Sequence, residues 1–580
     1  MSCLARLIYS PFSSSALWRP RQRESKSTEV VLLKDSPSLD ADSADPNSTA
    51  PEQRMIVLLP AEKLLRELLL ECAQHFPGLE IWITGGWVRD RLLGIPSSDL
   101  DLALSKVTGR EFGKFLEKFS SEPEIESKYR SKADDLGIPG SKFTRFHVME
   151  RNADMSKKLE TAGGKLFGLD VDLVNLRKEV YDGQSRTPDM EFGTPEEDAF
   201  RRDATVNSMF FHLGKQEVVD LTGRGLEDLA ARIMRTPLDP RQTFIDDPLR
   251  VLRLIRVGSK LGFALHLETT RCIKENEIRR ALDTMITRDR INIELFKMIR
   301  DVNAEVAFQH IFEFNLYIPV FLRLNSSLLE TLQTEFPILG LSTSPPWPMT
   351  WPRAYQLLAY LLEDSSNLGN MVQSEENVDY LWIMAAYAPI AGLRRNKLGQ
   401  AVQEATAAVK LPTKISKILE SALKNFDSIL AILDTTETQA EKPPSRSLVG
   451  MALRSWGATW STQVTYVMLA QAVYAPQNST ASAPSVYGSS MDESLTTSLL
   501  ERFFAFADFV WDQGLHDAHL KRPLLNGNEI QRLFGLQKGG KYLKSALDGL
   551  MAWQFDHVDA QVEDAKAWLL ERQGRLDVST

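Results

Sequence analysis

Two aspartates separated by a single residue, Asp99 and Asp101, carry the clearest chemical signal in the sequence. Leu100, Leu102 and Leu104 alternate with them as in a β-strand, where residues i and i+2 share a face about 6.6 Å apart. Two carboxylates this close are costly unless a cation lies between them, and hard oxygen ligands suit Mg²⁺. The pair therefore predicts a magnesium site for two-metal phosphoryl transfer. A bare pair of this kind is more often a solvated strand edge or a helix cap.

A glycine turn precedes the aspartates, and Gly86 lies 13 positions before Asp99. An apolar segment runs into Gly85 and Gly86, and a helix that contains Arg89 is expected to follow at once. Glycine lets a phosphate approach the backbone, and the free N–H groups at a helix start attract its charge. A Gly-Gly pair alone usually makes only a turn, but beside two carboxylates it favours a nucleotide site. We expect Gly85, Gly86 and Arg89 to hold a triphosphate.

The segment RRDATVNS, which begins at Arg201, adds donors for phosphate oxygens. Arg201 and Arg202 offer forked guanidinium groups to a triphosphate. On a helix expected over 196–211, Asp203 and Asn207 lie one turn apart and face one side, where they can bond to a ribose hydroxyl. A lone Arg-Arg-Asp segment is otherwise best explained as a surface cluster of ion pairs.

A second charged segment begins at Asp246 and reads DDPLR. Proline suits the first turn of a helix, so we expect a helix over 246–262 with Asp246 and Asp247 at its positive end. Arg250 and Arg253 follow on the same side of this helix. If Arg250 donates to a ring nitrogen and Asp247 accepts from an exocyclic amino group, cytosine and adenine fit, whereas uracil and guanine present the reverse order. The segment thus predicts selection of CTP and ATP without a template, unless the charges form only ion pairs along the helix.

The surrounding pattern places these segments on an α/β region that precedes a long helical region. We expect strands at 79–85, 99–104, 168–176 and 217–220 and near 143–149, and helices at 61–76, 86–94, 108–119 and 226–233. Helical periodicity then continues to 572, interrupted by two polar stretches, 434–447 and 475–492, that we expect to be loops or insertions.

In this order, the segments resemble the motifs of the class II nucleotidyltransferases of the polymerase-β superfamily, which comprise the tRNA CCA-adding enzymes and bacterial poly(A) polymerases. The segments that carry the resemblance are GGWVRDRLLGIPSSDLDLAL at 85–104, GLDVDLVNLRKEVY at 168–181, RRDATVNSMFF at 201–211, DLTGRGLEDL at 220–229, RTPLDPRQTFIDDPLRVLRLIRV at 235–257 and TRDRINIEL at 287–295. Such enzymes usually carry Glu where this chain has Asp246, which leaves the role of Asp246 open.

The resemblance implies an α+β head, with a polymerase-β-like palm and a mixed or antiparallel sheet, followed by an all-α neck, body and tail. It implies a third palm carboxylate at Asp172, although Asp170 lies on the same strand face. Gly223 and Gly225 would form a hinge, and residues 105–142 would form a flexible loop used in switching from CTP to ATP. The expected segments are a targeting and linker region at 1–54, the head at 55–225, the neck at 226–315, the body at 316–450 and the tail at 451–580.

The activity that the resemblance implies is template-independent addition of C, C and A to tRNA 3′ ends from CTP and ATP, with Mg²⁺ at Asp99 and Asp101. In the tail, Lys538, Lys541 and Lys544 are expected to contact tRNA phosphates. One alternative is a poly(A) polymerase of the same superfamily, which would accept only ATP. Another is a catalytically inactive RNA-binding protein, against which the intact aspartates argue. We expect the protein to be a monomer.

The composition of the chain limits which partners, metals and membrane segments are expected. The 580 residues carry a net charge of −9, but residues 201–300 contain 19 Lys and Arg against 14 Asp and Glu, which leaves a nucleic-acid partner open. The three cysteines share no metal-ligand spacing, which argues against zinc and against a disulfide framework. No apolar run approaches the roughly 20 residues that cross a membrane.

The first 23 residues contain four arginines and no acidic residue, a composition typical of a mitochondrial transit peptide. A disordered basic tail is the alternative interpretation. Residues 24–54 are rich in Ser, Asp and Pro and too poor in apolar groups to fold. A start at Met55 would give a shorter protein without the transit signal. We therefore expect a mitochondrial form and a cytosolic or nuclear form.

Overall fold

The structure, a computed structural model, describes residues 56–138, 162–180, 189–335, 350–374, 378–436, 444–475, 493–536 and 541–573. The chain forms two compact units, Met1–Thr270 and Arg271–Thr580, which are called the N-terminal and the C-terminal unit below. The expected targeting region and the expected strand near 143–149 lie outside the described residues. The division into linker, head, neck, body and tail stays a prediction.

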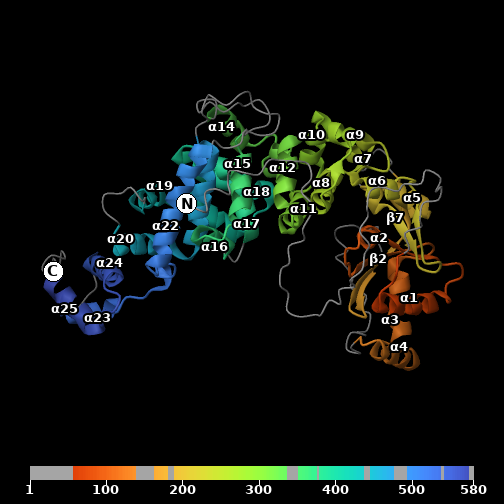
Figure 1. Cartoon of the computed structure of the whole chain (residues 1–580), viewed down its shortest axis with the longest axis horizontal. Helices are drawn as coiled ribbons and strands as arrows, with labels where there is room; N and C mark the ends of the chain where they lie inside the picture. Colours follow the sequence, from red (N-terminus) through yellow and green to blue (C-terminus); the bar gives the residue numbers. More distant parts are fainter. Residues whose placement is uncertain are drawn as a thin grey trace, which may run out of the picture. The chain divides into compact units, whose positions relative to one another are not determined.

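A six-stranded sheet forms the centre of the N-terminal unit (Figure 1). Its strands, in spatial order, are β3 (Ala162–Leu166), β4 (Leu169–Asn175), β2 (Asp99–Leu104), β1 (Ile81–Thr84), β7 (Met209–His212) and β8 (Glu217–Asp220). Strands β2 and β4 are parallel, and the other neighbours are antiparallel. Two further pairs are β5 (Arg177–Val180) with β6 (Asp189–Phe192), and β9 (Ile233–Met234) with β10 (Ala264–Leu265). The mixed sheet expected for the α+β head is confirmed.

Helices α1 (Pro60–Ala73), α3 (Gly109–Ser120) and α4 (Pro123–Asp135) lie together (Figure 1) and pack on one another. Helix α3 also contacts β4. Phe112 of α3 and Tyr129 of α4 are buried, and the Tyr129 hydroxyl donates a hydrogen bond to Glu71 of α1 at 2.7 Å. The prediction of a flexible loop at 105–142 is therefore wrong for residues 109–135. Apolar side chains at helical spacing fix both helices in place.

The expected helix at 196–211 is wrong beyond Phe200. Helix α5 (Pro195–Phe200) ends there, a 3₁₀ turn follows at Thr205–Asn207, and β7 comes next. Phe210 and Phe211 are both fully buried because β7 lies inside the sheet. Periodicity alone does not distinguish such a short apolar strand from a buried helix.

Pro248 divides the expected helix at 246–262 into two. Helix α7 (Pro240–Asp246) ends before it, and α8 (Leu249–Leu261) begins after it. Asp247 has an extended backbone, with φ −140° and ψ 95°, because a proline disfavours the helical region for the residue that precedes it. Helix α6 (Gly225–Ala231) precedes this pair, and α9 (Leu267–Ile273) follows it.

The C-terminal unit is helical throughout its described residues (Figure 1). Its helices are α10 (Asn276–Met285), α11 (Arg288–Arg300), α12 (Ala304–Glu313), α13 (Tyr317–Phe321), α14 (Ser327–Glu335), α15 (Pro352–Leu361), α16 (Asn367–Gln373), α17 (Val378–Ala386), α18 (Arg395–Val409), α19 (Thr413–Thr436), α20 (Arg446–Trp456), α21 (Trp460–Tyr474), α22 (Glu493–Asp512), α23 (Gly527–Leu533), α24 (Lys541–Asp556) and α25 (Val562–Arg572). Among the described helices of the chain, none is long and apolar enough to cross a membrane. Most of the two polar stretches, at 437–443 and 476–492, lies outside the described residues.

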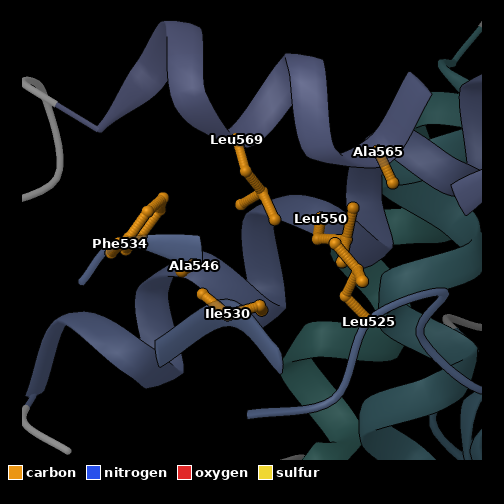
Figure 2. Close-up of a cluster of buried hydrophobic side chains, with 7 residues drawn as sticks. All are labelled: Leu525, Ile530, Phe534, Ala546, Leu550, Ala565 and Leu569. Carbon is orange, nitrogen blue, oxygen red and sulfur yellow. The ribbon is translucent and has the colours of Figure 1, made fainter. Parts of the chain in front are cut away.

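Helices α23, α24 and α25 enclose an apolar core of their own (Figure 2). The buried residues of this core are Leu525, Ile530, Phe534, Ala546, Leu550, Ala565 and Leu569. Each of the three helices contributes side chains that face the other two (Figure 2). This packing fixes α24, the helix that carries two of the predicted tRNA-binding lysines.

Candidate active site

Four aspartates lie on one face of the parallel strands β2 and β4. Asp99 is the register partner of Asp170, and Asp101 is the register partner of Asp172. Neighbouring strands lie about 4.8 Å apart, so the four carboxylates share one surface. The apolar residues that alternate with them are buried on the opposite face, namely Leu100, Leu102, Val171 and Leu173. The sheet thus places the three predicted carboxylates on one face of two neighbouring strands.

Asp170 and Asp172 have different neighbours. Lys165 Nζ lies 3.2 Å from Oδ1 of Asp170, and both side chains are more than half exposed. Gly163 of β3 is the register partner of Asp172, and a Cβ atom at this glycine would collide with the Asp172 carboxylate. The glycine therefore leaves room for the Asp172 carboxylate over β3, the strand that flanks β4 on the side away from Asp101.

A divalent cation with oxygen ligands fits this donor set, because like charges on adjacent strands need a counter-ion. Across the described ranges, no group of three or more His, Cys, Asp or Glu side chains is close enough to hold a metal ion. The carboxylates form an open surface, which leaves room for substrate oxygens around a catalytic ion.

Gly85 brings Asp101 close to Arg202. The glycine has φ 75° and ψ −137°, a conformation that other residues rarely adopt, and α2 (Gly86–Leu92) begins at the next residue. A Cβ atom at Gly85 would lie 3.4 Å from Nη1 of Arg202 and 3.6 Å from Oδ2 of Asp101. The predicted glycine turn, carboxylate and guanidinium therefore meet where the central strand β1 ends, beside Asp101 of β2.

A continuous chain of polar contacts joins Arg89 to helix α8. Arg89 Nη1 donates to Oδ1 of Asn207 at 2.5 Å, and its Nε donates to Asp90 at 2.8 Å. Asn207 Nδ2 donates in turn to Oδ1 of Asp203 at 3.1 Å. Arg253 Nε donates to the other oxygen of Asp203 at 2.7 Å. Asp203 and Asn207 thus meet as predicted, but across a tight turn and not on one helix.

Asp203 is kept ionised by its partners. Burial alone would raise the pKa of this carboxyl, but the charge of Arg253, the hydrogen bonds from Asn207 and Arg253 and the charge of Arg250 outweigh burial and hold the pKa far below its ordinary value. The Arg253 side chain remains 41% exposed, so part of its guanidinium is still accessible to a nucleotide.

Asp198 of α5 is a residue of this region that sequence reasoning missed. Its side chain is 1% exposed and accepts hydrogen bonds from both Arg201 and Arg202. Burial would raise the pKa of Asp198, but the charges of Arg202 and Arg201 and their hydrogen bonds lower it overall. The signal was present, since Asp198 precedes the arginines by three and four positions, the spacing of helical ion pairs.

The predicted base-selecting residues lie around the start of α8. Arg250 is buried, and Oδ1 of Asp247 accepts a hydrogen bond from the Leu249 backbone at 3.2 Å. Asp246 ends α7, and its Oδ1 accepts a hydrogen bond from Gln242 of the same helix at 2.7 Å. The expectation that both aspartates share the first turn of one helix is wrong, because the chain bends between them.

The two glycines of the expected hinge differ. Gly223 has φ 68° and open space on its Cβ side. At Gly225, where α6 begins, a Cβ atom would lie 2.8 Å from both the backbone carbonyl oxygen of Thr205 and Cγ of Met209. Gly225 therefore serves close packing against the 3₁₀ turn that contains Asn207.

The predicted tRNA-binding lysines are only partly described. Lys538 lies outside the described residues, and Lys541 is the first residue of α24. Lys544 is exposed and lines a cavity of about 460 Å³ with Arg454 of α20.

Comparisons with known proteins agree with this architecture. Residues 81–235 match the poly A polymerase head domain. The chain is 34% identical to nucleotidyltransferase lcsQ of Purpureocillium lilacinum, with 90% of this chain and 93% of that protein covered. It is 32% identical to the mitochondrial CCA tRNA nucleotidyltransferase of Saccharomyces cerevisiae, with 83% and 85% covered.

Solved structures share the fold. The Thermotoga maritima CCA-adding enzyme complexed with tRNA superposes with a TM-score of 0.54 at 18% identity, with 89% of this chain and 97% of that chain covered. With its full-length relatives, its mixed-sheet head and its helical remainder, the chain belongs to the class II CCA-adding tRNA nucleotidyltransferase family.

Proposed function

We propose that this protein adds C, C and A to tRNA 3′ ends from CTP and ATP without a template. The observation that carries the proposal is the meeting of Asp101, Gly85 and Arg202 beside the carboxylate of Asp172. Phosphoryl transfer requires carboxylates that can bind a metal ion, a turn that lets phosphate approach the backbone and a guanidinium group that donates to phosphate oxygens. The relative from S. cerevisiae carries the name of this activity, which supports the proposal.

In the proposed mechanism, Asp99 and Asp101 would hold Mg²⁺, and Asp172 would be the third catalytic carboxylate. The chemistry that Mg²⁺ would supply there is activation of the 3′-hydroxyl of the tRNA and neutralisation of charge on the departing pyrophosphate. Gly85 and Gly86 let the triphosphate approach the backbone.

Three arginines, Arg89, Arg202 and Arg253, would donate to the oxygens of the triphosphate. Hydrogen bonds within the protein already hold these three arginine side chains in place. Less side-chain entropy is therefore lost when the nucleotide binds. Asp203 and Asn207 lie between Arg89 and Arg253, where a ribose hydroxyl could bond to them.

Base selection is proposed for Asp247 and Arg250. Arg250 would donate to N3 of cytosine or N1 of adenine, and Asp247 would accept from the exocyclic amino group. A poly(A) polymerase would share the carboxylates and the glycine turn but accept only ATP, so use of CTP is the distinguishing property.

The proposed tRNA-binding surface of the tail is a cationic cluster of Arg446, Arg454, Lys521 and Lys544. Arg454 donates to the carbonyl of Lys521 and lines the same cavity as Lys544. Burial, and then the charge of Arg446, lowers the pKa of Lys521. Asp548 lines the same cavity as Arg454 and Lys544. Because the four cations outnumber this carboxylate, they would attract a phosphate backbone.

The function is tested with purified protein and a tRNA transcript that ends before CCA, with each labelled nucleotide supplied alone and ATP also supplied with unlabelled CTP. We expect incorporation from CTP alone and from ATP once CTP is present. Incorporation from ATP alone into long products would identify a poly(A) polymerase. No incorporation would support a catalytically inactive RNA-binding protein.

A mitochondrial location is proposed from the composition of residues 1–23 and from the mitochondrial name of the S. cerevisiae relative. A fluorescent protein fused after residues 1–54 should enter mitochondria, whereas protein that starts at Met55 should stay in the cytosol or nucleus. Cytosolic retention of the longer fusion would contradict a transit peptide.

A further inference from the structure

We propose that Asp198 is a positioning residue for nucleotidyl transfer, whose buried carboxylate directs Arg202 toward the triphosphate of the incoming nucleotide. The inference rests on the proposed function and adds to it a residue with no role in the sequence motifs discussed above. It predicts that the loss of Asp198 acts through Arg202 on phosphate binding and not on base choice or tRNA binding.

The contacts of Asp198 determine which edge of each guanidinium is held. Oδ2 accepts from Nε and Nη2 of Arg202, at 3.1 and 2.7 Å. Oδ1 accepts from Nε and Nη2 of Arg201, at 2.9 and 2.5 Å. One carboxylate therefore binds Nε and Nη2 of both guanidinium groups, which fixes the direction in which Nη1 of each group points.

The third nitrogen of Arg202 points toward the glycine turn. Nη1 would lie 3.4 Å from a Cβ atom at Gly85, on the side where Oδ2 of Asp101 also lies. It makes one long contact, at 3.4 Å, with the carbonyl of Asn207. The guanidinium carbon lies 5.1 Å from the centre of the Phe210 ring, which supports its plane from another side. Arg202 is thus held on two sides and directed at the site.

Arg201 is directed elsewhere, although it binds the same carboxylate. Its Nε also donates to the carbonyl of Arg177 in β5, at 3.2 Å. The backbone N–H of Arg177 donates to Oδ1 of Asp198 at 3.3 Å. Arg201 and Asp198 are thereby attached to the edge strand β5, and this attachment anchors the carboxylate that holds Arg202.

The position of Asp198 is itself well defined. Helix α5 is only six residues long, but Thr194 and Glu197 form reciprocal capping hydrogen bonds, at 3.2 and 2.8 Å, at its start. Since the carboxylate is buried and ionised beside two guanidinium groups, its removal would leave Arg202 without the contacts that fix its direction.

The test compares Asp198→Asn with the wild-type protein in three assays. Pyrophosphate inhibition against CTP measures the phosphate contact, the preference for CTP over UTP measures base choice, and filter binding measures affinity for tRNA. We expect the inhibition constant of pyrophosphate and the KM of both CTP and ATP to rise about tenfold to a hundredfold, the range for a lost charged hydrogen bond. Base preference and tRNA affinity should change by less than about threefold.

Asp283→Asn is the matched control. Asp283 is also buried and pairs with an arginine, Arg288, but this pair lies in the C-terminal unit, which contains none of the proposed nucleotide-binding residues. Its substitution should lower the thermal midpoint of unfolding to a similar extent and leave the pyrophosphate constant within about twofold. A similar rise in both variants would mean that Asp198 contributes only stability and would overturn the inference.

A double-mutant cycle with Arg202→Ala tests whether Asp198 acts through Arg202. If Asp198 acts through Arg202, adding Asp198→Asn to Arg202→Ala should raise the pyrophosphate constant no further, whereas additive effects would contradict the inference. If Asp198→Asn does not fold, Asp198→Glu keeps the charge and displaces it by one methylene, and it should raise the same constant in the same direction. Failure of the wild-type protein to extend tRNA at all would refute the proposed function, an outcome distinct from failure of the Asp198 variants to differ from wild type.

Discussion

Neighbouring carboxylates on β4 show how much of the site depends on contacts that the sequence does not contain. Asp170 and Asp172 share a strand face, so their spacing alone does not decide which of them is the third catalytic carboxylate. Their surroundings differ in the structure, since Asp170 pairs with Lys165 whereas the Asp172 carboxylate lies against Gly163. Asp198 was missed for a similar reason, since its importance lies in the direction that it gives to Arg202.

The first prediction concerns the third carboxylate. Asp172→Asn should reduce the rate of CTP and ATP incorporation at least about a hundredfold, as expected for a lost electrostatic contact in the transition state. Asp101→Asn should have the same effect, and tRNA affinity should stay within a few fold in both variants. Asp170→Asn, on the same face of the same strand, is the control and should keep a rate close to wild type. Equal losses at positions 170 and 172 would contradict the assignment.

The second prediction concerns base choice at α8. Arg250→Ala removes the donor to the base, and Asp247→Ala removes the acceptor, whereas the carboxylates of the sheet are unchanged. Each variant should lose about 1–3 kcal/mol of preference for CTP and ATP over UTP and GTP, the cost of an unpaired buried polar group. Ratios of kcat/KM for the four nucleotides measure this loss. Unchanged ratios with a uniformly lower rate would make the pair structural.

At the scale of elements, long periodic segments could be predicted and short ones could not. The helices near 61–76, 86–94 and 108–119 and the strand at 99–104 are present within a few residues. The sequence did not reveal β3, because its Ala-Gly-Gly-Lys-Leu composition lacks a strand pattern. It also placed β7 inside a helix, since a buried strand and a buried helix are both apolar.

The third prediction concerns helix α12 and pH. Burial, and then the charge of Glu363, raises the pKa of Glu305 to about 6 from 4.5. The stability that neutral Glu305 contributes is complete below pH 4.5 and is lost as the pH rises through 6. Glu305→Gln should therefore increase the free energy of unfolding by up to about 2 kcal/mol at pH 7.5, with no gain near pH 4.5.

Glu313, at the other end of α12, is the matched control for Glu305. Burial raises its pKa, but the nearby His310, whose Nδ1 lies 3.7 Å from Glu313 Oε2, and a hydrogen bond from Gln309 at 2.8 Å lower it overall. Its charged form therefore stabilises the fold above its ordinary pKa, and Glu313→Gln should be destabilising at pH 7.5. Denaturant titrations of both variants at several pH values test the opposite signs. Destabilisation by both substitutions at pH 7.5 would contradict the account of Glu305.

At the scale of the whole molecule, the order of an α+β head and a helical remainder could be predicted, and the helical core could not. Trp351 and Tyr355, with ring centroids 5.0 Å apart, pack against Phe308 and Phe321 in the C-terminal unit. The spacing of Trp351 and Tyr355, four positions apart, predicts that these two rings meet, but nothing in the sequence indicates that they contact Phe308 and Phe321. Of the cationic cluster of the tail, the sequence predicted only Lys544, because Arg454 and Lys521 are far from Lys544 along the chain.

The fourth prediction concerns that cluster. Lys544→Ala and Arg454→Ala should weaken tRNA binding several fold, and each should reduce the slope of log affinity against log salt concentration by about one, as for one lost phosphate contact. Lys566→Ala on α25 is the control, because Lys566 is already paired with Glu563 at 2.7 Å. An unchanged salt slope in the cluster variants would place the tRNA elsewhere.

The central claim is tested most directly by sequencing the 3′ ends that the purified protein makes on a tRNA transcript lacking CCA, with all four nucleotides present at equal concentration. The account predicts products that end in CCA and contain no added U or G, because Asp247 and Arg250 accept only cytosine and adenine. Long oligoadenylate tails, or ends in which U and G appear as often as C and A, would contradict it.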